Sequence, residues 1–265
     1  MSFKQKYGPY ALITGGTSGI GEEMAKIVAS KGVNIILVAR RENVLSEKAN
    51  ILQKEYGVDV KTISADLTKK EDLDKVLRET EGLEIGLLIP NAAIENHGFM
   101  MDIDLEKELS AIQLDVVSVF TMTHHFGKKM AERGRGGILL VSSMIGHMPN
   151  PYFSNYAGIK AYIANLGFSL NYELKKKGVD VTVLSPGPTD TPMLNGAMGG
   201  MDLSKMPMAI QKADYVAQLG IDGLGKKPHV IPGFKNTLMV RMAKMMSIST
   251  SINSGGKMMD KAMNS

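Results

Sequence analysis

Tyr156 and Lys160 are four residues apart, a spacing that places both side chains on one face of a helix. A free tyrosine has a pKa of about 10, which is too high for efficient acid–base catalysis near neutral pH. A neighbouring ammonium group favours the phenolate and would lower that pKa. The pair could therefore give a proton to a carbonyl oxygen, or take one from an alcohol.

Spacing alone does not identify this pair, because Tyr172 and Lys176 repeat it sixteen residues later in the same predicted helix. At about 100° per residue, sixteen residues turn the helix by roughly 160°, so the two pairs face nearly opposite directions. Thirteen residues before Tyr156 is Ser143, at the end of a predicted strand, whereas Ile159 holds that position before Tyr172. Ser143 could donate a hydrogen bond to a substrate oxygen and stabilise its developing charge. This context favours the first pair.

A glycine-rich turn joins the first predicted strand to the first predicted helix. It reads Thr14-Gly15-Gly16-Thr17-Ser18-Gly19-Ile20-Gly21. Glycines let backbone amides approach phosphate oxygens closely, and a helix N-terminus adds unpaired N–H groups and a partial positive charge. A plain strand-to-helix turn would seldom use so many glycines, so we expect a bound pyrophosphate. The expected contacts are Gly15, Thr17, Ser18, Gly19, Ile20 and Gly21.

Two arginines, Arg40 and Arg41, follow the second predicted strand. A site for NAD usually has an acidic residue there, which accepts hydrogen bonds from the ribose 2′-hydroxyl. The guanidinium fork instead suits a 2′-phosphate. We therefore predict NADP(H), with the alternative that one or both arginines are solvated at a helix start. An oxidised nicotinamide would lower the pKa of Tyr156 further.

These motifs occur in the order and spacing of one known family. The T-G-x-x-x-G-x-G turn, the serine and the Y-x-x-x-K pair resemble the short-chain dehydrogenases/reductases over about residues 8–232. The resemblance implies hydride transfer between a nicotinamide and a carbonyl or secondary alcohol. The opening segment KYGPYALITGG and the two arginines also resemble bacterial hydroxysteroid dehydrogenases and eukaryotic 3-ketoacyl reductases. The methionine-rich segment after Thr191 suggests a hydrophobic substrate, such as a steroid or an acyl ketone. The alternative is a catalytically weak, cofactor-binding regulatory or scaffold protein with the same fold.

The resemblance also implies further cofactor contacts. Asp66 and Leu67 match the adenine-contacting pair, although Asp66 could equally be a helix N-cap. Asn91 and Ala92 match the segment along the ribose. The segment after the sixth strand matches the loop that holds the nicotinamide carboxamide, or is only a rigid turn. Its expected contacts are Pro186, Gly187, Thr189 and Thr191, and Tyr156 and Lys160 are also expected to touch the cofactor.

Two positions depart from the family pattern. Pro90-Asn91-Ala92-Ala93 replaces the usual N-N-A-G, and Pro90 cannot donate a ladder hydrogen bond. Asp115 stands where family members usually have an asparagine that holds a water behind the lysine. Our hypothesis is that Asp115 takes this role and stabilises the Lys160 ammonium, or that burial raises its own pKa. The alternative is an impaired proton relay with slow turnover.

Short apolar runs alternate with longer helical stretches along the chain. Strands are predicted at residues 10–14, 34–39, 60–65, 85–89, 138–142, 179–184 and 229–231. Helices are predicted at residues 20–31, 44–56, 71–80, 104–133, 155–177 and 214–224. This order predicts a single, doubly wound, Rossmann-type α/β domain over residues 1–265, with a mostly seven-stranded parallel sheet and helices on both faces. Ligands of such sheets bind beyond the carboxyl ends of the strands.

Composition excludes several classes of site. The 265 residues contain no cysteine, which rules out disulfides and thiolate ligands and is compatible with the cytoplasm, our expected location. The net charge of +4 is spread along the chain, so we expect no nucleic-acid partner. No metal site and no membrane span are expected. The family resemblance implies a homodimer or homotetramer.

The C-terminal third is rich in methionine. We expect a substrate loop at about residues 192–212, in which Met193, Leu194, Met198, Met201, Met206 and Met208 adapt to an apolar substrate or simply pack. A C-terminal extension covers about residues 234–265. Residues 238–248 could form a docked helix, a dimer contact or a membrane-surface helix, and residues 249–256 resemble a flexible tail. His97 and His147 could line the pocket, whereas His124 and His125 are expected to cap or pack on a helix.

Overall fold

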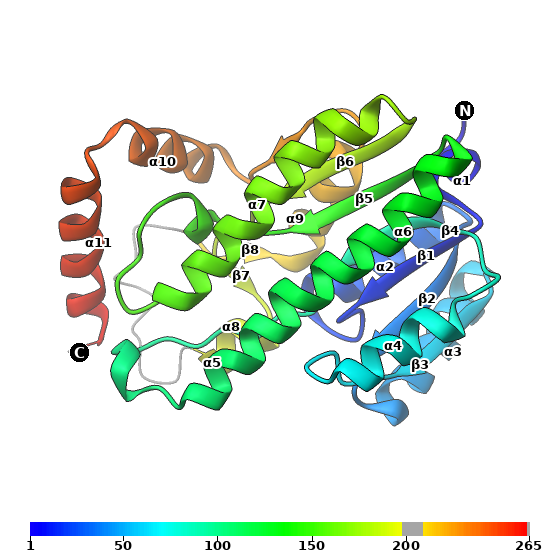
Figure 1. Ribbon diagram of the computed structural model, residues 1–265, viewed down its shortest axis with the longest axis horizontal. Helices are drawn as coiled ribbons and strands as arrows, with labels where there is room; N and C mark the ends of the chain where they lie inside the picture. The colour runs from blue at the N-terminus through cyan, green and yellow to red at the C-terminus, as the bar shows by residue number, and fades with distance from the viewer. Residues whose placement is uncertain (198–208, 264–265) are drawn as a thin grey trace.

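A seven-stranded parallel sheet forms the centre of the computed structural model, which describes residues 1–197 and 209–263. Its strands lie in the order β3-β2-β1-β4-β5-β6-β9 (Figure 1). Their bounds are Tyr10–Thr14 (β1), Asn34–Ala39 (β2), Val60–Ser64 (β3), Ile85–Pro90 (β4), Gly136–Val141 (β5), Val179–Leu184 (β6) and His229–Val230 (β9). The order reverses between β1 and β4, the place where doubly wound sheets bind ligands. The predicted fold class is confirmed.

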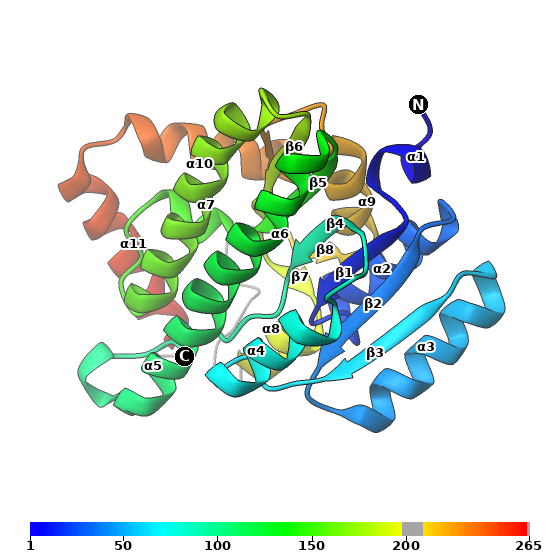
Figure 2. The ribbon, with the colours of Figure 1, turned by 45° about the vertical axis from the view of Figure 1, so that its right-hand side comes forward.

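Two apolar clusters cover the two faces of the sheet. On one face, α2 (Gly19–Ser30), α3 (Glu42–Tyr56) and α9 (Ala213–Gly223) pack on alternate strand residues such as Ile13 and Leu37. On the other face, α4 (Lys70–Glu79), α6 (Val119–Arg133) and α7 (Ser154–Lys175) pack on residues such as Leu12 and Ile36 (Figure 2). Strands buried on both faces read as continuous apolar runs, which is why the sequence revealed them.

The helix predicted from Asp104 to Arg133 contains a wider turn in its middle. Asp104 caps it as expected, by accepting hydrogen bonds from the amides of Glu106 and Lys107. α5 (Leu105–Ile112) then leads into a π-helical segment, Gln113–Ser118, which continues into α6. Single π turns inside helices are often found at functional sites. This one includes Asp115.

The C-terminal extension consists of α10 (Phe234–Met245) and α11 (Ile248–Met263). The prediction of a flexible tail at residues 249–256 was wrong, because these residues lie within α11. The helix has tertiary partners: the Tyr152 hydroxyl donates to Asp260 over 2.6 Å, and Met259 is buried. Among the described residues, no helix has the length and apolarity needed to cross a bilayer.

Smaller elements complete the chain. They are α1 (Phe3–Tyr7), α8 (Pro192–Ala197), a two-stranded sheet of β7 (Thr189–Asp190) and β8 (Gln211–Lys212), and short 3-10 turns at Met100–Asp102 and Met144–His147. α8 belongs to the expected substrate loop. Met198, Met201, Met206 and Met208 of that loop lie outside the described residues.

Candidate active site

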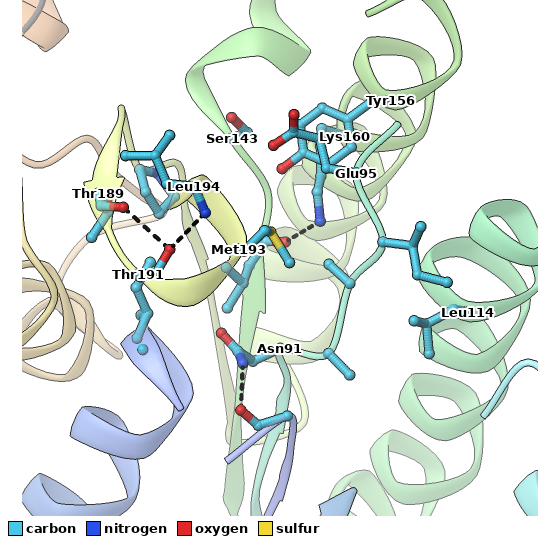
Figure 3. Close-up of a pocket in the computed structure, with 18 of the residues that line it drawn as sticks. Asn91, Glu95, Leu114, Ser143, Tyr156, Lys160, Thr189, Thr191, Met193 and Leu194 are labelled. Carbon is cyan, nitrogen blue, oxygen red and sulfur yellow. Dashed lines mark hydrogen bonds between the residues drawn. The ribbon is translucent and has the colours of Figure 1, made fainter. Parts of the chain in front are cut away.

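A cavity of about 410 Å³ lies at the carboxyl ends of the strands. Its lining includes Arg40 and Asp66, the glycine-rich turn, and Ser143, Tyr156 and Lys160. Figure 3 shows the last three residues. Every site residue predicted from the sequence lines it except two. Gly21 lies against Asn91, and Asp115 lies behind Lys160. One cavity therefore brings the motifs together.

The glycine-rich turn has the shape of a phosphate cradle. Gly15 and Gly19 have φ values of +65° and +55°, in the left-handed region that favours glycine. At Gly21 a Cβ atom would lie 2.4 Å from the side-chain nitrogen of Asn91, so no larger residue fits there without a shift. α2 begins at Gly19, and Ser18 makes no side-chain bond that caps it. The N-terminus of α2 can thus receive an anion, as the pyrophosphate of NADP(H) requires.

Thr14 fixes the segment after β4, a role that the sequence did not reveal. Its hydroxyl accepts hydrogen bonds from the amides of Asn91 and Ala92, each over 3.0 Å. The Asn91 side chain donates in turn to the carbonyl of Thr14 over 3.2 Å. Pro90 still lies in β4 and pairs with Thr14, so the strand ends one residue later than predicted.

The adenine end of the cavity is basic. Arg40 and Arg41 are exposed, line the cavity and form no ion pair with any carboxylate of the described residues. They could therefore hold a 2′-phosphate. Asp66 accepts hydrogen bonds from the amide and hydroxyl of Thr68. The N-cap of α4 is Lys69, so the alternative role of Asp66 as that cap is excluded.

Ser143, Tyr156 and Lys160 meet where β5 ends against α7. The Ser142 hydroxyl donates to the Lys160 carbonyl over 2.7 Å and ties the two elements together. The Lys160 ammonium lies 5.3 Å from the centre of the Tyr156 ring. Tyr172, by contrast, is 69% exposed, as the helical rotation predicted. Only the first tyrosine faces the cavity.

Lys160 and Asp115 form a buried ion pair. Lys160 Nζ lies 3.1 Å from Asp115 Oδ2, and the side chains are 5% and 0% exposed. The other carboxylate oxygen of Asp115 accepts a hydrogen bond from the Ile94 amide over 3.0 Å. Burial raises the pKa of Asp115, and the Lys160 charge opposes this shift. Asp115 thus contacts the ammonium directly.

The pKa of Tyr156 shifts in the direction opposite to the expectation from the sequence. Burial raises it above its usual value of 10.0, and the charges of Glu95 and Asp115 raise it further, while the Ser143 hydroxyl lowers it. The Lys160 charge is shared with Asp115 at short range. In the protein alone, Tyr156 therefore keeps its proton at neutral pH.

Glu95 is a site residue that sequence reasoning missed. It lines the cavity, its side chain is 10% exposed, and burial raises its pKa to about 7. Figure 3 shows it beside Tyr156 and Lys160. Its only sequence signal was its place just after Pro90-Asn91-Ala92-Ala93, because no spacing links it to another motif.

The expected nicotinamide loop packs on the Ser143 turn. The Pro186 carbonyl accepts a hydrogen bond from the Met144 amide over 2.9 Å. The Thr191 hydroxyl donates to the Thr189 carbonyl over 3.2 Å and accepts from the Leu194 amide over 3.3 Å. These bonds fix the loop next to α8, where the predicted contacts line the cavity.

None of the histidines lines the cavity, so the pocket-lining interpretation of His97 and His147 was wrong. His97 stacks on Phe153 at 5.4 Å. His147 and His229 each lie 2.9 Å from the Ser185 hydroxyl, behind the nicotinamide loop. The remaining two pack on α6 as expected, His124 against Phe120 and His125 against Phe126.

Comparison with known proteins gives a consistent result. The family model described as short chain dehydrogenase matches residues 9–199. A 7beta-hydroxysteroid dehydrogenase of Mediterraneibacter gnavus is 32% identical, over 91% of this chain and 92% of that protein. A very-long-chain 3-oxoacyl-CoA reductase of Anas platyrhynchos is also 32% identical, over 86% of this chain and 74% of that protein.

Solved structures show the same likeness. One of a 7beta-hydroxysteroid dehydrogenase has a TM-score of 0.89 at 31% identity, over 97% of this chain and all (100%) of that chain. A short-chain dehydrogenase from Sphingobium yanoikuyae, in complex with NADPH, has a TM-score of 0.79 at 29% identity, over 90% of this chain and 95% of that chain. The first likeness extends over the C-terminal helices.

Proposed function

The chain belongs to the short-chain dehydrogenase/reductase family, and from this premise we propose how its residues perform NADP(H)-dependent hydride transfer between a nicotinamide and a ketone or secondary alcohol. The observation that carries the proposal is the meeting of Ser143, Tyr156 and Lys160 in the cavity of the glycine-rich turn. NADP(H), when bound, supplies or accepts the hydride. Arg40, Arg41 and the N-terminus of α2 would hold its phosphates.

The acid–base work falls to Tyr156. The phenol holds its proton at neutral pH, since its pKa is raised, and is placed to give that proton to the oxygen of a bound ketone as the hydride arrives at the carbonyl carbon. Ser143 would donate a second hydrogen bond to that oxygen. Lys160, fixed by Asp115, orients the phenol and supplies positive charge beneath it. This arrangement suits carbonyl reduction.

The substrate end of the cavity is apolar. Its lining includes Leu114, Phe153, Met193, Leu194, Met258 and Met259. Such a wall favours a hydrophobic ketone of the steroid or acyl type, and the two relatives described above are a hydroxysteroid dehydrogenase and a 3-oxoacyl-CoA reductase.

A panel of hydrophobic ketones and alcohols, followed by nicotinamide absorbance, tests the function. We expect NADPH-dependent turnover that Tyr156→Phe reduces by at least roughly 100-fold, because the proton donor is lost. Tyr172→Phe is the matched control and should keep wild-type activity, since Tyr172 lies on the solvent side of α7. Cofactor binding without turnover of any ketone or alcohol would instead support a regulatory or scaffold role.

Self-association is the second part of the proposal. The outer face of α5 and α6 exposes Leu109, Val117 and Phe120, at 46%, 39% and 47%. Covering such an apolar face would favour a homodimer or homotetramer. Light scattering should give a mass above one chain, and Phe120→Asp should reduce it; a monomeric wild-type protein would contradict this.

We further infer a cytoplasmic location. The lack of cysteine in the sequence is compatible with a reducing compartment. Cell fractionation should recover the protein with cytoplasmic enzymes, and recovery with membranes would contradict the inference.

A further inference from the structure

Glu95 places a buried carboxyl group in the reaction cavity. The residue follows β4, and its side chain lies beside Tyr156 and Lys160, as Figure 3 shows. The side chain is 10% exposed. Its Oε1 atom is buried and accepts no hydrogen bond from any described residue. Within the proposed mechanism, this group has no task.

The neighbours of Glu95 leave its hydrogen-bonding capacity unused. His97 Nδ1 is 3.5 Å from Oε1, and burial lowers the pKa of His97, which favours the neutral imidazole. The Lys160 ammonium is engaged by Asp115 at 3.1 Å. A carboxyl group held away from water without a donor is unfavourable. Because Glu95 lines the cavity, a ligand there that supplies a donor to this carboxyl group would be bound preferentially.

The chemistry of that donor follows from the surroundings. The cavity is lined by apolar residues such as Leu114, Phe153 and Leu194, in addition to its catalytic groups. Glu95 therefore adds a polar group where a largely apolar substrate would meet Tyr156. With a pKa raised to about 7, both the carboxylate and the carboxylic acid are populated near neutral pH. A hydroxyl group satisfies both forms, because it can donate to the first and accept from the second. An ammonium group would satisfy only the carboxylate.

We propose that Glu95 binds a hydroxyl group of the substrate close to the reacting carbonyl, so that the enzyme prefers α-hydroxy ketones, and vicinal diols in the reverse direction, to matched substrates without the hydroxyl. Glu95 is near enough to Tyr156 for its charge to act on the phenol, and this proximity places the bound hydroxyl close to the carbonyl (Figure 3). The proposal rests on the function proposed above and adds the substrate class.

The test compares 2-hydroxyacetophenone with propiophenone, which differ by a hydroxyl in place of a methyl group, and a steroid α-ketol with its deoxy ketone. We expect the wild-type kcat/KM, with NADPH, to favour each hydroxy ketone. Glu95→Leu should reduce the hydroxy-to-deoxy ratio by roughly 10- to 100-fold, as loss of a hydrogen bond to a charged group implies. Glu95→Gln, which can still accept and donate, should keep most of the preference.

Glu106→Leu is the matched control, because Glu106 is exposed on α5 and outside the cavity. It should leave the ratio at its wild-type value. Circular dichroism and the Kd for NADPH verify that each variant is folded, and Glu95→Ala replaces the leucine variant if that one does not fold. If the hydroxy-to-deoxy ratio is the same in wild type and Glu95→Leu, and both ketones are reduced, the role of Glu95 is overturned while the proposed function stands. Turnover of no ketone or alcohol would overturn the proposed function, and this inference with it.

Discussion

Asp115 determines how much positive charge Lys160 can lend to Tyr156. Its carboxylate lies 3.1 Å from the ammonium and is fully buried. The pair brings a negative charge close to the phenol, and that charge helps to raise the pKa of Tyr156. Asp115 is therefore expected to act as a positioning residue that also keeps the phenol protonated.

Asp115→Asn tests this role while keeping the acceptor for the Ile94 amide. Removing the negative charge lowers the pKa of Tyr156, so the phenolate needed for alcohol oxidation forms at lower pH. The pH dependence of kcat/KM for oxidation with NADP+ should therefore shift to lower pH. Asp102→Asn, at an exposed aspartate, should leave the profile in place. An unshifted profile for Asp115→Asn would contradict the role, as would an unchanged kcat in Asp115→Ala.

Arg40 and Arg41 should decide between the two nicotinamide cofactors. Each alanine substitution should raise the Kd of NADPH about 10- to 100-fold, because a hydrogen bond to a charged group is lost, and leave the Kd of NADH nearly unchanged. Isothermal titration calorimetry measures both. Arg78→Ala is the control, since Arg78 is exposed on α4 and outside the cavity. Equal losses for both cofactors would argue against 2′-phosphate recognition.

Some residues of this cavity could be predicted from the sequence, and others could not. The serine thirteen residues before Tyr156, Ser143, distinguished this tyrosine from Tyr172 in the sequence. The structure places both Ser143 and Tyr156 at the cavity. Glu95 escaped notice because its importance arises from burial, which one residue in a loop does not reveal. The pKa of Tyr156 was predicted in the wrong direction for the same reason: its rise comes first from burial and then from two carboxylates on different elements.

At the scale of elements, Asp115 contacts Lys160 from within the π-helical segment. Asp104 at the start of the helix and Gly134 after its end are residue types typical of those positions, and the structure has both as caps. The wider turn between them was not, because apolar periodicity does not distinguish a π turn from an α turn over six residues. Within it, the Ser118 hydroxyl donates to the Leu114 carbonyl. This local bond has no signature in the sequence.

α11 should control access to the substrate end of the cavity. Met258 and Met259 contribute to the lining, and Tyr152 holds the helix through Asp260. Tyr152 has a φ of +68°, a strained conformation for a residue with a side chain. The serine- and glycine-rich composition of residues 249–256 suggested a flexible tail. The contacts of Met259 and Asp260 with the rest of the protein account for a helix there instead.

Removal of residues 247–265 tests the role of α11. We expect KM for a hydrophobic ketone to rise roughly 10-fold, because two buried or partly buried methionines would no longer cover the substrate. The Kd of NADPH should change little, since Arg40 and Arg41 are at the other end of the cavity. Steady-state kinetics and a cofactor titration separate the two. Lys257→Ala, at an exposed position of α11, is the control; an unchanged KM in the truncated protein would exclude contact with substrate.

At the scale of the whole molecule, the sheet could be predicted because its central strands are buried on both faces and helices connect the first six strands. The sequence could not predict which side chains come together from the loops that follow β5 and β6 and from the start of β9. His147 follows β5, Ser185 follows β6 and His229 begins β9, and both imidazoles lie 2.9 Å from the one hydroxyl. The two rings are 4.8 Å apart, with Phe168 packed on both. This cluster joins three strand ends.

The cluster should make the folded state sensitive to acid. Burial lowers the pKa of His147 and of His229 to about 4, and the Lys244 charge adds to the effect. An unfolded chain protonates these imidazoles below about 6.5, whereas the folded chain resists until about 4. The unfolded state therefore binds more protons in this window, so stability is full above pH 6.5 and declines as the pH falls toward 4.

Thermal unfolding between pH 7 and pH 5 measures this decline. In the double variant His147→Gln, His229→Gln, the amides can still bond to Ser185 but do not titrate, so the fall in Tm should be smaller than in wild type. His124→Gln, at an exposed position on α6, should keep the wild-type slope. Equal slopes in wild type and the double variant would mean that groups other than the two imidazoles govern the response. The buried carboxyls Glu95 and Asp115 are not among those groups. Their raised pKa values have the opposite sign, since protonation on acidification favours the folded state, so they cannot account for a decline. A smaller slope in the double variant therefore assigns the loss of stability to the cluster that joins the three strand ends.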